Sequence, residues 1–159
     1  MKERFNAKEW EQLKRLPIHM FSFVALADQE LQPEEVETFA SELGDALKYK
    51  DPLISDLFAD LVRGDSFSEA FDAAMGIVKG GVAGMDQELL STRKVLEEKL
   101  TSEEYNRFFF SMTGVGVKVA NAAGNPRESF SPEEQTMLTG FMMKFDVDLE
   151  AGRKALAKL

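Results

Sequence analysis

The chain has 159 residues, 44% of them hydrophobic, a size and composition that suit one globular domain with a full core. Its formal net charge of −9 repels phosphate backbones and anionic lipid head groups, which disfavours sequence-independent nucleic-acid binding and favours metal cations or basic partners, so no nucleic-acid partner is expected. The sequence contains no cysteine, which excludes disulfides, thiolate metal sites and cysteine catalysis.

Two features of the N-terminal region bear on location. Residues 1–16 are charged, so a signal peptide is not expected. The longest apolar run, residues 17–27, is far shorter than the roughly 20 residues that cross a bilayer. We therefore expect a soluble, cytoplasmic protein without direct membrane insertion.

The first helix is predicted from Asn6 to about Leu16. Asn6 and Glu9 have the spacing of a capping box, and Phe5 is placed to pack on Trp10 as a hydrophobic staple. Pro17 is then expected to open a second helix, because proline suits the first helical position. This second helix has almost no polar face, which predicts a buried central helix.

A third helix is predicted from Pro33, with an apolar stripe along one side: Val36, Phe39, Ala40, Leu43 and Leu47. Asp51 and Pro52 have the residue types that cap and start a fourth helix. Ser66 to Glu69 has the spacing of another capping box, which predicts the start of a fifth.

The glycines between 80 and 84 interrupt this pattern, since glycine in a helix costs conformational entropy and adds no packing. They predict a connection between two halves, approximately residues 1–79 and 85–159. In the second half, helices are expected to begin at Asp86, Thr101, Ser131 and Leu149. The prediction is a single all-α domain of eight or nine helices.

The two halves share an internal repeat. Aligning Pro33 with Pro132 (132 − 33 = 99) pairs Glu35 with Glu134, and it also pairs three further positions: Glu34 with Glu133, Phe39 with Leu138, and Leu43 with Met142. Each copy has a buried helix, a polar turn, an apolar residue, a proline, two glutamates and an amphipathic helix. This order predicts a pseudo-two-fold fold.

With Ala27-Asp28, Leu31 and Glu35, the first copy resembles the TerB-like family, named from a bacterial tellurite-resistance protein and also found as a co-chaperone module. The family pattern has Ala-Asp-Gly after an apolar helix, an aliphatic residue three positions after the aspartate, and a glutamate seven after it. Gln29 replaces the glycine, and Arg127 stands at the aspartate position of the second copy. The resemblance implies an all-helical fold and an acidic cluster associated with divalent metal.

The candidate metal ligands are Asp28, Glu30 and Glu35, whose oxygens suit Ca²⁺, Mg²⁺ or Mn²⁺. Glu35 and Glu134 lie three residues into their helices, where a carboxylate also caps backbone N–H groups. Asp28 ends a helix, where the dipole disfavours an acid. Solvation, a basic partner or a cation would each offset that cost, and the sequence leaves all three open.

Other sites fit the sequence less well. An EF-hand is excluded, because counting from Asp28 puts Pro33 and Phe39 where that loop needs glycine and glutamate. A di-iron bundle would need paired Glu-x-x-His motifs, and His19 is the single histidine. We expect His19 to be a hydrogen-bonded core or boundary residue.

The expected function is that of a non-enzymatic interaction or sensing module in a bacterial stress response, with a divalent cation at the acidic turn. One alternative is a metal-free interaction or oligomerisation domain, because Met142 and Met143 cannot both face inward on one helix. A second alternative is a small hydrolase using paired carboxylates, although the sequence offers no nucleophile–base pair. No catalytic residue and no organic cofactor is assigned.

Overall fold

Every regular element described in the computed structural model is a helix, and this confirms the predicted all-α class. The structure describes residues 1–25, 33–122 and 132–159. Within these ranges the elements are α1 (Ala7–Ala25), α2 (Pro33–Gly44), α3 (Pro52–Leu61), α4 (Ser66–Lys79), α5 (Val82–Lys99), α6 (Ser102–Ala122), α7 (Pro132–Met143) and α8 (Leu149–Ala157), with 3-10 helices η1 (Lys2–Arg4) and η2 (Ala46–Lys48).

The start of α1 confirms the predicted capping box and staple. The Asn6 amide donates to Glu9 Oε2 at 2.8 Å, and the Glu9 amide donates to Asn6 Oδ1 at 2.9 Å. The rings of Phe5 and Trp10 lie 5.8 Å apart. These contacts satisfy backbone donors that the first helical turn leaves without intrahelical partners.

The predicted break at Pro17 is wrong, because α1 continues through this residue to Ala25. Proline inside a helix removes one backbone hydrogen bond and crowds the preceding turn. Here Pro17 is buried, and so are most of the residues on both sides of it, from Leu13 to Val24. Burial of this apolar length therefore outweighs the local cost of the proline.

One predicted capping box and one further predicted helix start are also wrong, although α4 does begin at Ser66. Asp65, not Ser66, is the N-cap of α4, and the Ser66 hydroxyl accepts a hydrogen bond from Lys14 Nζ at 2.9 Å. The sixth predicted helix begins at Val82, and Asp86 lies inside it, where it accepts a bond from Lys144 Nζ at 2.7 Å. Both side chains are used in contacts with distant helices, which local sequence spacing cannot reveal.

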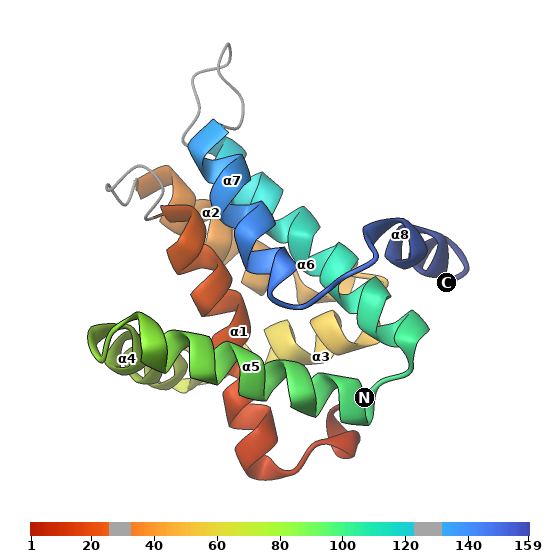
Figure 1. Ribbon diagram of the computed structural model, residues 1–159, viewed down its shortest axis with the longest axis horizontal. Helices are drawn as coiled ribbons and strands as arrows, with labels where there is room; N and C mark the ends of the chain where they lie inside the picture. The colour runs from red at the N-terminus through yellow and green to blue at the C-terminus, as the bar shows by residue number, and fades with distance from the viewer. Residues whose placement is uncertain (26–32, 123–131) are drawn as a thin grey trace.

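The long helices α1 and α6 are the centre of the arrangement (Figure 1). The helices α4 and α5 lie across α1, whereas α8 packs along α6 beside the C-terminus. Gly116 lets α6 approach its neighbours, since a Cβ atom there would lie 2.9 Å from Leu138 and 3.3 Å from Met20. Gly116 therefore permits close packing of α6 against α1 and α7.

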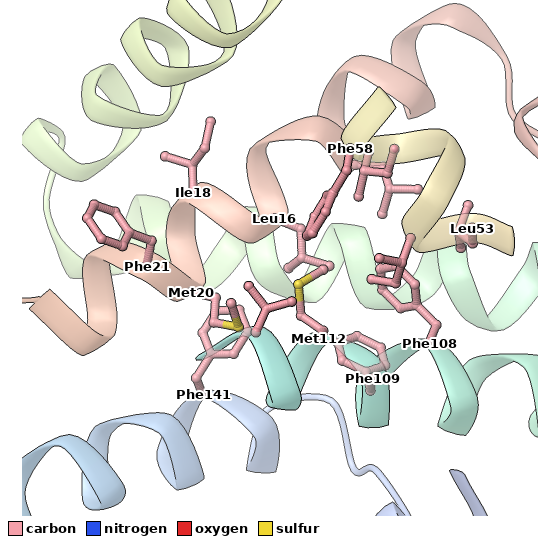
Figure 2. Close-up of a cluster of buried hydrophobic side chains, with 14 of the residues drawn as sticks. Leu16, Ile18, Met20, Phe21, Leu53, Phe58, Phe108, Phe109, Met112 and Phe141 are labelled. Atoms are coloured by element: carbon pink, nitrogen blue, oxygen red, sulfur yellow. The ribbon is translucent and has the colours of Figure 1, made fainter. Parts of the chain in front are cut away.

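The core lies where α1, α3, α6 and α7 meet, and Figure 2 shows side chains from all four helices converging there. It is rich in phenylalanine and methionine, including Met20, Phe58, Phe108, Phe109, Met112 and Phe141, each with no exposed surface. Aromatic pairs add directional contacts to the area buried, as between Phe109 and Phe145, whose rings are 4.5 Å apart.

The outer ends of two helix pairs come together in space. The C-terminal ends of α1 and α6 and the N-terminal ends of α2 and α7 all lie toward one end of the molecule, at the upper left of Figure 1. Both α2 and α7 begin at the aligned prolines and contain 12 residues. Glu35, one of the three predicted metal ligands, lies in the first turn of α2 at this end.

Candidate functional site

Two buried carboxylates mark the corresponding first turns of α2 and α7. Glu35 is 2% exposed and Glu134 is 3% exposed, whereas their neighbours Glu34 and Glu133 are exposed. A buried carboxylate is costly unless charges or hydrogen-bond donors surround it. The same position of both helices therefore holds a buried acidic side chain.

The remaining pattern of the repeat is preserved in part. Phe39 and Leu138 are both buried, and so are Leu43 and Met142. Val36 is 43% exposed, however, and Leu47 is 91% exposed. Ala40 is exposed as well. The predicted stripe of the third helix is thus wrong at these three positions, and Leu47 lies beyond the end of α2 at Gly44, in the separate helix η2.

Of the three predicted metal ligands, the structure places one. Asp28 and Glu30 lie outside the described residues, as do Gln29 and Arg127 of the family pattern. Within the described ranges, no group of three or more histidine or acidic side chains is arranged to hold a metal ion. Glu35 is the predicted ligand that lies within the described residues, and it is buried in the first turn of α2.

His19 is a core residue, as predicted, but the expected hydrogen bond is not formed. It is 1% exposed, and neither Nδ1 nor Nε2 has a hydrogen-bond partner in the described part of the chain. Burial lowers its pKa from 6.5 to about 4, an effect that nearby Glu88 opposes and Arg15 reinforces. The imidazole is therefore neutral at physiological pH.

A polar cluster around Glu42 was not predicted from the sequence. Glu42 is 7% exposed and accepts bonds from Lys48 Nζ at 2.8 Å, Lys118 Nζ at 3.3 Å and the Tyr49 hydroxyl. Burial alone would raise the pKa of Glu42, but the bonds from Lys48 and Tyr49 outweigh it and hold the pKa below its ordinary value. Burial and the bond to Glu42 raise the pKa of Tyr49.

The sequence indicated this cluster only in part. Glu42 precedes Leu43 on the inner part of α2, where an unpaired acid would be unfavourable. Lys48 lies six residues away and could have been suspected, whereas Lys118 is 76 residues away. Only the packing of α2 against α6 identifies that second partner.

None of the described helices is long and apolar enough to span a bilayer. Comparisons of the chain with protein-family models, with curated proteins and with solved structures find no match. The chemistry of its own residues is therefore the basis for assigning a function to this protein.

Proposed function

We propose that this protein is a non-enzymatic TerB-like helical module that acts by binding, as an interaction or sensing domain in a bacterial stress response. A divalent cation, Ca²⁺, Mg²⁺ or Mn²⁺, would bind at the corner between α1 and α2 through Asp28, Glu30 and Glu35. The observation that carries the proposal is the repeated burial of Glu35 and Glu134 at aligned positions of two helices of equal length.

The mechanism follows from charge. Carboxylates that lie close together repel each other, and a hard cation with oxygen ligands would remove that repulsion. Because Glu35 is fixed in the first turn of α2, a cation that also binds the segment after α1 would set the angle between these helices. A partner that recognises one angle would then sense the cation.

The state of His19 disfavours the hydrolase alternative. A general base must reach its proton and titrate near the working pH. His19 has a pKa of about 4 and is buried without a polar partner among the described residues. A binding role uses the buried carboxylates without requiring a nucleophile.

Titration calorimetry tests the cation. Purified protein should release or absorb heat with at least one of Ca²⁺, Mg²⁺, Mn²⁺ and Zn²⁺, and Asp28→Asn or Glu35→Gln should weaken binding by about tenfold or more, because each removes a charged ligand. The matched control is Glu34→Gln, one residue away and exposed. No heat for any of the four ions would remove the cation and leave only the interaction module.

A second candidate, the metal-free interaction or oligomerisation domain, is favoured by an apolar groove between α6, α7 and α8. The groove has a volume of about 380 Å³, and its walls include Val117, Leu138, Met142 and Met143. Met142 is buried, whereas Met143 is 74% exposed. Methionine is common at binding surfaces because its side chain adapts to different partners.

This candidate predicts self-association that increases with concentration. Light scattering should show a rising mass for the wild type, and Met143→Glu should abolish the rise by placing a charge in the apolar contact. Leu47→Glu is the matched control, because Leu47 is 91% exposed but does not line this groove. A constant monomer mass at all concentrations would contradict self-association.

A further inference from the structure

A second groove, which we call the lysine groove, lies between η2, α6 and α8. It has a volume of about 730 Å³. Its apolar lining comes from Phe110, Val117 and Leu156, and its charged lining comes from Lys48, Lys50 and Lys118. Apolar walls beside a few convergent polar groups are typical of small-molecule sites.

The lysine groove is locally positive in a chain whose net charge is −9. Lys48 and Lys118 share Glu42, and Lys48 also lies 3.5 Å from the exposed Asp45. Against these two acids stand three lysines, which leaves one positive charge in excess (3 − 2 = 1). Lys50 supplies it, because it has no ion-pair partner among the described residues.

Two of the ammonium groups are held in place before any ligand arrives. The Nζ atoms of Lys48 and Lys118 lie 5.4 Å and 5.9 Å from the centre of the Tyr49 ring. The hydroxyl of that ring is itself fixed on Glu42. Such preorganisation reduces the entropy lost when a lysine side chain binds a ligand.

Ser111 is a buried polar residue in the wall of the lysine groove. It lines the lysine groove and is 8% exposed, and its Oγ has no hydrogen-bond partner in the described part of the chain. Most hydroxyls in such positions have a partner, because an unsatisfied buried polar group lowers stability. The Oγ atom itself is fully buried, so the lysines and the apolar walls, and not this hydroxyl, are available to a ligand in the groove.

We propose that the lysine groove binds a small organic anion with an apolar body, such as a carboxylate or phosphate monoester carrying a hydrocarbon or aromatic group. The lysines would attract the charged end, and Phe110, Val117 and Leu156 would cover the apolar body. A neutral apolar molecule would leave the excess positive charge unused. An inorganic anion would leave the apolar walls uncovered.

The probe is anilinonaphthalene sulfonate, an aromatic anion whose fluorescence rises in an apolar site. The folded wild type should show saturable enhancement, and octanoate and octyl phosphate should displace the probe at least about tenfold more strongly than octanol or inorganic phosphate. Equal displacement by octanol would contradict the charge requirement. Equal displacement by inorganic phosphate would contradict the apolar requirement.

Two variants locate the site, each with a matched control. Lys50→Glu should weaken binding about fivefold or more, whereas Lys94→Glu makes the same change at an exposed lysine outside the groove. Gly114→Leu should block the groove, and a Cβ atom at Gly114 meets nothing within 4 Å, so the fold should persist. Gly140→Leu is its control, with equally open space in α7.

Circular dichroism and thermal unfolding should confirm that all four variants remain folded. Loss of binding in Lys50→Glu and Gly114→Leu alone supports the proposal. Absence of saturable binding to the wild type would overturn it. Unchanged binding in both groove variants would place the probe elsewhere and would overturn it equally.

Discussion

Asp51→Ala should lower the free energy of unfolding by about 3–5 kcal/mol. Asp51 is 1% exposed, and its Oδ1 atom accepts bonds from the Leu53 and Ile54 amides at 3.0 Å each. Its Oδ2 atom accepts a bond from Arg107 Nε at 2.7 Å. The substitution therefore removes the cap of α3 and leaves the buried Arg107 guanidinium without its counter-charge.

Urea denaturation of the full chain measures this loss. Asp51→Asn should cost less, because its amide oxygen can still cap the helix, and adding Arg107→Met to Asp51→Ala should restore part of the stability by removing the unpaired charge. Asp45→Ala is the control, since Asp45 precedes η2 but makes no side-chain cap bond, and it should change stability by less than about 0.5 kcal/mol. A loss below about 1 kcal/mol for Asp51→Ala would contradict the buried ion pair.

Asp51 also shows how far local sequence can predict this fold. The cap was predictable, because an aspartate before a proline is a strong helix-start pattern. Its partner Arg107 was not, since it lies 56 residues away on α6. The failures at Ser66 and Asp86 have the same origin, because both side chains bond to distant lysines instead of to their own helices.

Pro17 illustrates a different limit. Proline is a strong local signal for a helix start, yet α1 passes through it because packing on both sides favours one continuous helix. Tertiary burial can thus override a residue's conformational preference. The repeat was more informative than any single residue, since it aligned α2 with α7 and Glu35 with Glu134, whereas the burial of these two glutamates is known only from the structure.

The candidate site was predictable only in outline. The sequence identified a first turn with acids, and burial now separates Glu35 and Glu134 from their exposed neighbours. The lysine groove gave no sequence signal, because its walls come from three separate elements. Lysine side chains are usually solvated, so three lysines in a sequence indicate a binding site only when the fold places them around one cavity.

The second large predicted effect is a loss of folding stability at acidic pH, and it depends on His19. Its pKa is about 4 in the folded protein, below the ordinary value of 6.5. Between these values the unfolded chain binds a proton that the folded chain does not, so stability falls as the pH falls. Lowering the pH from about 7 to about 5 should therefore cost about 2 kcal/mol through this one group.

His19→Leu should remove most of that pH dependence, because leucine is apolar and does not titrate. It should leave stability at neutral pH nearly unchanged, since it also replaces two buried nitrogens that lack hydrogen-bond partners among the described residues. Ser22→Ala is the control, one turn farther along α1, where the serine hydroxyl donates to the Ile18 carbonyl. It should lower stability equally at both pH values.

Denaturation of the three proteins at both pH values separates a proton effect from a packing effect. The chain has one histidine, so few other side chains titrate in this window, and the difference between wild type and His19→Leu reports mainly this imidazole. Parallel pH profiles for the wild type and His19→Leu would mean that the pKa of His19 is the same in the folded and the unfolded chain. The lowered pKa of His19 would then be contradicted, and so would the argument against an acid–base role for this residue.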